Sequence, residues 1–242
     1  NMIERLKKQQ DKLLIAERYA AWESVARKLA HEIKNPLTPI QLSIDRLQEK
    51  FYKKITSGQD EFKNYLLTIN RQIRDIENLV NEFSSFARMP SPVFKKIEIA
   101  LIAQRAVDFY KMSSLNKIQL KPTEQKIFIN GDEEQLYRVF INLLKNSEDS
   151  FLEQMQKNKL FIGKIDVAIS NNDDITKIVI VDNGSGIKDT SKIMTPYFTT
   201  KKDGTGLGLP IVSKIVSEHK GEIIITNYKP GVKVLITLPK IN

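Results

Sequence analysis

The sequence lacks cysteine altogether and contains two histidines among its 242 residues. Without cysteine the chain forms neither disulfides nor thiolate metal sites. The histidines, His31 and His219, are too few to predict a histidine metal centre. No apolar run approaches the ~20 residues of a membrane-spanning helix, and no signal-peptide pattern is present. The remaining composition, 41% apolar and 28% charged, is that of an ordinary globular protein of one or two domains.

A concentrated basic run is also missing, although basic residues are in excess. The net charge is +9, from 38 basic and 29 acidic residues, and it is spread along the chain. Aromatic and basic residues do not alternate as they do on a nucleic-acid stacking surface. We therefore expect no nucleic-acid partner. A DNA-binding protein is the alternative, and a steep salt dependence of DNA affinity would support it.

The first part of the chain, residues 1–89, has the apolar spacing of two packed helices. Apolar residues recur three and four positions apart on either side of 52–61, a stretch that contains Gly58. They are Trp22, Ala26, Leu29, Ile33, Leu37, Ile40, Ile44, Leu47 and Phe51, then Phe62, Leu66, Ile69, Ile73, Ile76, Val80, Phe83 and Ala87. Two apolar residues per heptad predict a helical hairpin that forms a four-helix bundle in a homodimer.

The second part, residues 90–242, follows a proline-marked linker at 88–92 and has a different period. Short runs rich in β-branched residues predict strands at 126–130, 164–170, 177–182, 222–227 and 232–238. Helical patterns lie between them at 99–112, 132–155 and 207–218. This alternation predicts an α+β sandwich, with a mixed sheet covered by helices on one face.

His31 lies on the solvent side of the first predicted helix. It is two residues from both Leu29 and Ile33, and two steps of ~100° place it opposite the apolar seam. Pro36 and Pro39 follow within the same helix, where each removes a backbone donor at a cost of ~3 kcal/mol. An ordinary surface histidine would not account for these prolines. They predict a bend beside a functional residue.

Glycine and asparagine patterns in the second part point to phosphate and metal chemistry. GTGLGL at 204–209 precedes an apolar helix, whose free N–H groups favour phosphate binding. Neither GxGxxG nor GxxxxGK[ST] is matched, and plain turns remain an alternative. Asn142 and Asn146 lie at i and i+4 on one helix face, and amide oxygens are hard ligands suited to Mg²⁺. Two solvated asparagines are the competing interpretation.

Five motifs together resemble bacterial sensor histidine kinases. HEIKNPL at 31–37 resembles their phosphoacceptor box, and NLLKN at 142–146 resembles their N box. DNGSGI at 182–187, PYFTTK at 196–201 and GTGLGL at 204–209 resemble their G1, F and G2 boxes. The set occurs in the family's order over nearly the whole chain. The sequence from Ala21 to Leu47 is similar to that of the NtrY-type sensors of nitrogen regulation.

The resemblance implies a dimerisation and phosphotransfer hairpin followed by a Bergerat-type (GHKL) ATP-binding domain. It implies autophosphorylation from ATP with Mg²⁺, phosphotransfer to an aspartate of a response regulator receiver domain, and phosphatase activity on that regulator. His31 resembles the phosphoaccepting histidine, and Glu32 matches the acid that helps to deprotonate it. Asn35 matches the residue that positions water for dephosphorylation.

The resemblance also assigns nucleotide-binding roles. Asn146 resembles the Mg²⁺ ligand, with Asn142 beside the phosphates, and Asp182 resembles the acceptor of the adenine amino group. Gly184 and Gly186 let the chain pass close to the base. The remaining positions assigned to the nucleotide are Ile187, Phe198, Thr199, Lys201, Gly204, Thr205, Gly206, Leu207, Gly208 and Arg138. Residues 188–206 would form a lid over ATP, with Phe198 as its packing anchor.

Two departures and two rival functions complete the interpretation. Ser147 stands where the family more often has alanine, and the lid is short. A silent scaffold would lack His31, Asn146 or Asp182, and all three are present. A clamp ATPase would have a water-activating glutamate in place of Asn142. The chain starts directly in charged helical sequence, and we expect it to be a piece of a longer protein. The resemblance implies a cytoplasmic fragment of an inner-membrane sensor, with any membrane attachment through segments outside this chain.

Overall fold

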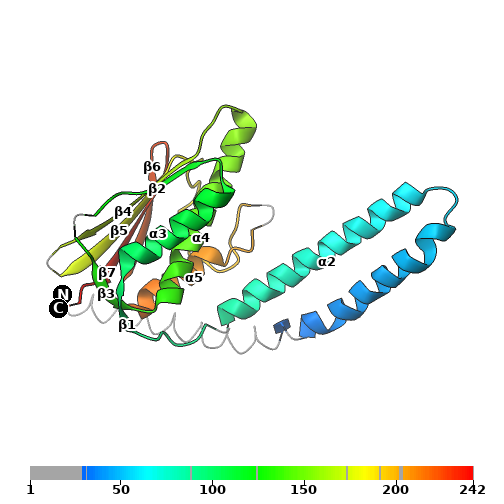
Figure 1. The fold of residues 1–242 in the computed structure, drawn as a ribbon, viewed down its shortest axis with the longest axis horizontal. Coiled ribbons are helices and arrows are strands. Elements are labelled where there is room, and N and C mark those ends of the chain that lie inside the picture. Colours follow the sequence, from blue (N-terminus) through cyan, green and yellow to red (C-terminus); the bar gives the residue numbers. More distant parts are fainter. Residues whose placement is uncertain are drawn as a thin grey trace. The chain divides into compact units, whose positions relative to one another are not determined.

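The computed structural model divides into two compact units, Asn1–Pro90 and Ser91–Asn242. Figure 1 shows the helices and strands of both units. The described residues are 29–30, 32–87, 89–123, 125–172, 174–190, 192–201 and 204–241. Within these ranges, no helix has both the length and the apolar character of a membrane span.

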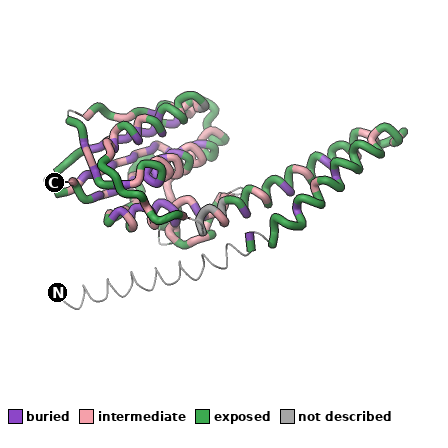
Figure 2. The backbone as a smooth tube through the Cα atoms, turned by 60° about the horizontal axis from the view of Figure 1, so that its bottom comes forward, coloured by how far each residue is buried: buried purple, intermediate pink, exposed green. Residues whose placement is uncertain are grey.

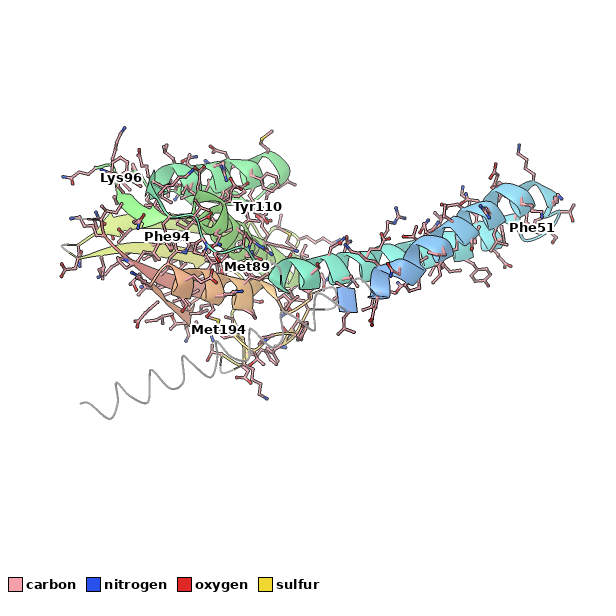
Figure 3. The ribbon with its side chains drawn as sticks, turned by 90° about the horizontal axis from the view of Figure 1, so that it is seen from below. Phe51, Met89, Phe94, Lys96, Tyr110 and Met194 are labelled. Carbon is pink, nitrogen blue, oxygen red and sulfur yellow. The ribbon has the colours of Figure 1, made fainter. Side chains whose placement is uncertain are left out.

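The described part of the first unit is a helical hairpin. Residues 32–51 form one helix, a 3₁₀ turn (η1, Tyr52–Lys54) follows, and α2 runs over Gln59–Ala87. Phe51 lies at the turn of the hairpin (Figure 3). The break is shorter than the predicted 52–61, because Asp60 and Glu61 occupy the first turn of α2, where carboxylates favour helix formation. Gly58 supplies the positive φ of the connection.

The hairpin buries one seam position per heptad on each helix and exposes the other. Leu37, Ile44, Leu66 and Ile73 are buried against one another. Figure 2 shows this as buried positions recurring among exposed ones along both helices. Large apolar side chains of the predicted seam are exposed at Leu29, Ile33, Ile40, Leu47, Phe51, Ile69 and Ile76. The two helices therefore cover only part of their shared apolar surface.

Pro36 and Pro39 lie inside a helix that runs without interruption from residue 32 to 51. Neither proline has an N–H to donate to the carbonyl four residues earlier. Ser43 Oγ donates to the Pro39 carbonyl at 2.8 Å. His31 lies outside the described residues, as do Trp22 and Ala26, so the predicted bend beside His31 stays a prediction.

The second unit is built on a mixed, five-stranded sheet with the order β2-β4-β5-β7-β6. Strand β2 is parallel to β4, and the other neighbours are antiparallel. Figure 1 shows the three helices on one side of this sheet, which confirms the predicted α+β class. The bounds are α3 Ile99–Ser113, β2 Lys117–Leu120, α4 Glu133–Lys157, β4 Lys164–Asn171, β5 Ile175–Asp182, α5 Gly208–Glu218, β6 Glu222–Tyr228 and β7 Gly231–Pro239.

Two short strands, β1 and β2, were not expected from the sequence. Strand β1 (Lys95–Glu98) pairs antiparallel with β3 (Phe128–Gly131) in a small second sheet, and β2 forms one edge of the large sheet. Each has four residues with at most two large apolar side chains. Such segments are too short to show a period of two, so pairing with distant strands decides their conformation.

His219 is a structural residue of this unit. It is 3% exposed, and its Nε2 accepts a hydrogen bond from the Asp132 N–H at 2.9 Å. Its Nδ1 lies 2.8 Å from the Ile215 carbonyl and therefore carries the donated proton. Both nitrogens are thus satisfied in the neutral ring. Burial lowers the pKa of His219 below its ordinary value of 6.5.

Acidification is expected to destabilise the second unit through His219. Below an ordinary pKa of 6.5 the unfolded chain binds a proton that the folded chain takes up only at lower pH. The free energy of unfolding should therefore fall as the pH drops through this window, by at most about 1.4 kcal/mol per pH unit. Urea midpoints near pH 7.5 and pH 5.5 measure the effect. An equal pH dependence in His219→Gln, which does not titrate, would contradict this origin.

Candidate functional site

Asp182, the last residue of β5, is a buried carboxylate with well-defined donors. Its Oδ1 accepts hydrogen bonds from the Gly184 N–H at 2.9 Å and the Val232 N–H at 3.2 Å. Its Oδ2 accepts from Ser147 Oγ at 3.1 Å. Among the described residues, these three groups are the donors to the carboxylate. A carboxylate has about four acceptor positions, so Oδ2 can accept one further donor, such as a base amino group.

Ser147 is a buried polar residue among the buried apolar residues of α4. The hydroxyl also lies 3.3 Å from the Leu143 carbonyl, and its single proton can serve that carbonyl or Asp182. The departure from the alanine expected here therefore has a structural consequence. A hydroxyl now reaches the carboxylate proposed to recognise the base.

The chain leaving β5 passes directly against α4. A side chain at Gly184 would overlap the Ser150 side chain, and Gly186 has a φ of +74°. Asn227 on β6 holds the next residue, because its Oδ1 accepts from the Ile187 N–H at 2.7 Å and its Nδ2 donates to the Ile187 carbonyl at 2.8 Å. Sequence reasoning missed Asn227. An asparagine inside the apolar strand EIIITNY was the available signal.

The two asparagines of α4 face the beginning of α5. A Cβ added to Gly208 would lie 3.2 Å from Asn142 Oδ1 and 3.8 Å from Asn146 Nδ2. Asn142 Nδ2 donates to the Arg138 carbonyl at 2.8 Å, and Asn146 Oδ1 accepts from Lys201 Nζ at 3.2 Å. Asn146 Nδ2 is buried and has no hydrogen-bond partner among the described residues. This amide is available to a ligand at the N-terminus of α5.

The segment before α5 is folded back on itself through Gly206. Gly206 has a φ of +68°, and its carbonyl accepts from the Tyr197 N–H at 3.1 Å. Burial raises the pKa of Tyr197 to about 12. Thr205 Oγ1 accepts from the N–H of Leu207 at 3.4 Å, and the Leu207 side chain is buried. These contacts place the glycines of GTGLGL beside the α5 N-terminus.

Gly206→Ala is expected to weaken nucleotide binding at least about tenfold, because the added Cβ cannot be accommodated where the chain now runs. The Cβ would lie 2.5 Å from the Tyr197 carbonyl carbon and 2.8 Å from the Phe198 nitrogen. Titration with a fluorescent ATP analogue measures the affinity. Gly58→Ala is the matched control, since Gly58 also has positive φ but only Glu61 Oε2 nearby, at 3.7 Å. Unchanged nucleotide affinity in Gly206→Ala would contradict the expectation that the chain around Gly206 has no room for a Cβ.

The structure thus gathers the predicted nucleotide residues in one unit. Asp182 and Gly184 contact α4 at Ser147 and Ser150, and Gly208 lies beside Asn142 and Asn146 of the same helix. Arg138 lies one turn before Asn142. Phe198 is half-buried, while Thr199 is exposed.

The predicted catalytic residues lie in the first unit. Glu32 and Asn35 are exposed on the helix 32–51. His31 is outside the described residues. The structure therefore presents the acid and the amide to solvent on the helix that the sequence assigns to phosphotransfer.

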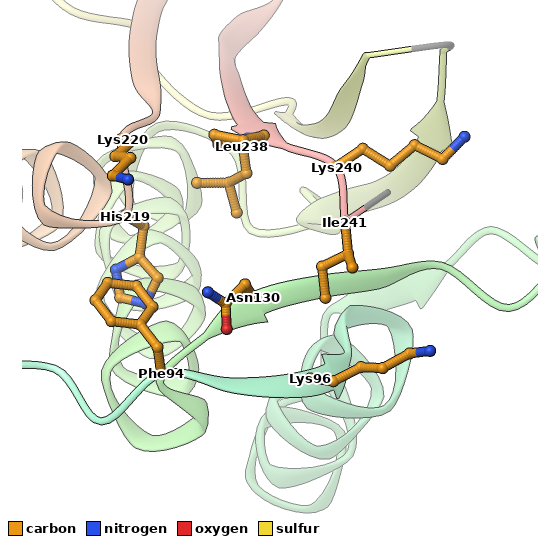
Figure 4. Close-up of a pocket in the computed structure, with 9 residues that line it drawn as sticks. Phe94, Lys96, Asn130, His219, Lys220, Leu238, Lys240 and Ile241 are labelled. Carbon is orange, nitrogen blue, oxygen red and sulfur yellow. The ribbon is translucent and has the colours of Figure 1, made fainter.

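A pocket of about 500 Å³ lies elsewhere in the second unit (Figure 4). None of the predicted site residues lines it. Its wall includes His219, whose nitrogens are already used, and Lys96, whose Nζ lies 4.9 Å from the centre of the Phe128 ring. The other lining residues are Phe94, Asn130, Lys220, Leu238, Pro239, Lys240 and Ile241. This pocket is not the candidate nucleotide site.

Two family profiles match parts of this chain. Residues 21–92 match the profile of the His Kinase A (phospho-acceptor) domain, and residues 131–242 match that of the histidine kinase-, DNA gyrase B-, and HSP90-like ATPases. An NtrY-like sensor histidine kinase of Rickettsia felis is 41% identical over 229 residues, which cover 93% of this chain and 37% of the relative. The nitrogen regulation protein NtrY of Azorhizobium caulinodans is 38% identical over 221 residues, covering 90% and 28% respectively.

Solved structures show the same fold. Full-length ShkA in complex with AMPPNP has a TM-score of 0.66 at 19% identity, covering 90% of this chain and 46% of that chain. The mycobacterial sensor histidine kinase MprB has a TM-score of 0.52 at 22% identity, covering 61% and 98%.

The fold and the matched domains define a phosphoacceptor hairpin joined to a GHKL-type ATPase domain. The chain belongs to the sensor histidine kinase family, and its similarity to NtrY-like members extends over most of its length. The predicted family and fold class are confirmed. The chain spans about a third of the length of the curated relatives that it matches.

Proposed function

We propose that this chain is the catalytic core of a two-component sensor. Residues 90–242 bind ATP with Mg²⁺, and residues 1–89 receive the γ-phosphoryl group on His31. The phosphoryl group then passes to an aspartate of a response regulator receiver domain. The buried Asp182 carboxylate, with one acceptor position still available, is the observation that carries the proposal.

The nucleotide-binding part rests on two complementary ends of the site. The adenine amino group would donate to Asp182 Oδ2 and fill its remaining acceptor position. The phosphates would meet the free N–H groups at the start of α5, next to the unpartnered Asn146 amide nitrogen. The two ends lie along one face of α4, which therefore sets the spacing between base and phosphates.

The donor set at Asn146 fits Mg²⁺. Its Oδ1 is a neutral, hard oxygen beside the expected phosphates, and Mg²⁺ is commonly held by few protein oxygens together with phosphates and water. The ion would neutralise phosphate charge, and phosphoryl transfer depends mainly on positioning and such neutralisation. Asn146 would hold it, and the N-terminus of α5 would hold the phosphate oxygens.

The phosphoacceptor part rests on residue chemistry. A histidine with an ordinary pKa near 6.5 is largely neutral at pH 7, so a ring nitrogen is available as nucleophile. That nitrogen bonds to the γ-phosphorus as the bond to ADP breaks, and the adjacent Glu32 accepts the ring proton. Asn35, one turn later, would position water for removal of phosphate from the regulator. Both side chains are exposed, as contact with a partner requires.

The unpaired half of the hairpin seam supports a homodimer. Ile33, Ile40 and Leu47 recur every seven residues and are exposed. Pairing them with a second hairpin would bury one continuous four-helix core. Attachment of such a core to the cytoplasmic side of an inner membrane, through segments outside this chain, follows from the sensors that the chain resembles.

Incubation with Mg²⁺ and γ-labelled ATP tests this function. We expect covalent label that is lost in acid and stable in alkali, because a phosphorus–nitrogen bond breaks when the nitrogen is protonated. Acid-stable label would identify a different acceptor. ATP hydrolysis without label would favour the clamp ATPase, and bound nucleotide with neither outcome would favour a scaffold.

A further inference from the structure

Lys201 bridges two side-chain oxygens of α4, and the proposed function uses only one of the two residues, Asn146. Its Nζ lies 3.2 Å from Asn146 Oδ1 and 2.8 Å from Asp149 Oδ2. Asn146 and Asp149 are three residues apart, so their side chains share one helix face. Asp149 was not among the residues predicted from the sequence. The ammonium group therefore occupies the space between the proposed metal ligand and an additional carboxylate.

This arrangement has the chemistry of a divalent cation position. Mg²⁺ selects carboxylate and amide oxygens, and one or two protein oxygens commonly suffice when phosphates complete its coordination. An ammonium group also binds these oxygens, so Lys201 and a metal ion would compete for the same position. The Lys201 and Asp149 side chains are 37% and 33% exposed, so the ion pair is partly screened by water. Such a pair can be exchanged for a more highly charged ion.

Asp149 carries an electrostatic influence beyond this ion pair. Tyr110 lies on α3 (Figure 3). Burial, and then the nearby charges of Asp149 and Glu148, raise the pKa of Tyr110 to about 12. An unneutralised carboxylate would repel incoming phosphates. A cation held at Asp149 at every stage of nucleotide binding removes that repulsion.

We propose that the Lys201 ammonium group occupies the position between Asn146 and Asp149 until a metal-bound nucleotide replaces it. Asn146 Oδ1 and Asp149 would then hold the metal, which would neutralise phosphate charge, and the Lys201 ammonium group would be released toward the phosphates. Asp149 and Lys201 are positioning residues for the metal–nucleotide complex. This inference rests on the proposed function and deepens it.

The exchange also connects the metal to the segment before α5. The Lys201 N–H donates to Thr199 Oγ1 at 3.1 Å, and the Lys201 carbonyl accepts from the Gly204 N–H at 3.4 Å. The backbone of Lys201 is therefore part of a local turn, and its side chain anchors that turn to α4. Release of the ammonium group would free this anchor.

Binding of Mn²⁺ in the absence of nucleotide, followed by the electron paramagnetic resonance signal of free Mn²⁺, tests the proposal. Lys201→Met should bind Mn²⁺ about tenfold more tightly than the wild type, because the competing cation is gone. Adding Asp149→Asn should abolish the gain. Lys192→Met is the matched control, since it removes an exposed lysine from the same lid segment.

The outcomes separate this inference from the proposed function. If Lys201→Met binds Mn²⁺ no better than Lys192→Met, or binds none, Lys201 does not compete with the metal and the inference is wrong. If the Lys201→Met gain persists with Asp149→Asn, Asp149 is not part of the site. A wild type that binds no fluorescent ATP analogue in the presence of Mn²⁺ would instead contradict the nucleotide-binding function itself.

Discussion

Replacing His31 with glutamine is expected to reduce phosphate incorporation from γ-labelled ATP to background. Glutamine keeps a polar side chain of similar size, but its amide nitrogen is not nucleophilic at neutral pH. The phosphoryl group would then have no acceptor. Acid-labile label retained on the protein, quantified per chain after gel separation, measures the effect.

Nucleotide affinity provides the control for His31→Gln. The residues proposed to bind ATP lie in Ser91–Asn242, whereas His31 belongs to the other compact unit. A fluorescent ATP analogue should therefore bind the variant with wild-type affinity. Acid-labile label of wild-type amount in His31→Gln would show that another residue is the acceptor and would overturn the proposed phosphotransfer.

Asp182→Asn is expected to weaken ATP binding about 100-fold, equivalent to about 3 kcal/mol. The amide oxygen would keep the position that accepts from the Gly184 and Val232 N–H groups. The amide nitrogen would then replace Oδ2 and present its own hydrogens to the adenine amino group. Two donors would face each other, and the hydrogen bond to a charged acceptor would be lost. Calorimetric titration with an ATP analogue measures the change.

Asp166→Asn is the matched control for Asp182→Asn. Asp166 lies on the neighbouring strand β4 and pairs in register with Val181, but its carboxylate contacts Lys164 and Gln119. The same chemical change there should leave ATP affinity unchanged. If Asp182→Asn also binds ATP normally while remaining folded, the base is recognised elsewhere and the assignment of Asp182 fails.

The helices that carry the site could be predicted because each has its own local pattern. Asn142 and Asn146 at i and i+4 indicated one polar face of α4, and GTGLGL before an apolar run indicated the start of α5. The hairpins β4–β5 and β6–β7 followed from short turns between runs of β-branched residues. These features depend on neighbouring residues, so sequence periodicity was sufficient.

Contacts between residues far apart in the sequence could not be predicted in the same way. Asn227 binds Ile187 from forty positions away, and Lys201 reaches Asp149 across 52 positions. Neither pair has a local sequence pattern. Strand pairing and the return of the chain before α5 bring each pair together, so these contacts appear only in the folded unit.

Local patterns in the sequence were enough to predict the helical hairpin, the α+β class and the motifs that mark the family. Apolar periodicity and turn residues act over short stretches and fold the same way in many contexts. The folded structure was needed to show which seam residues the hairpin leaves exposed and which groups donate to Asp182. It also decided where the Lys201 ammonium lies. Burial and hydrogen-bond satisfaction depend on every element packed around a group, so they become defined only when those elements meet.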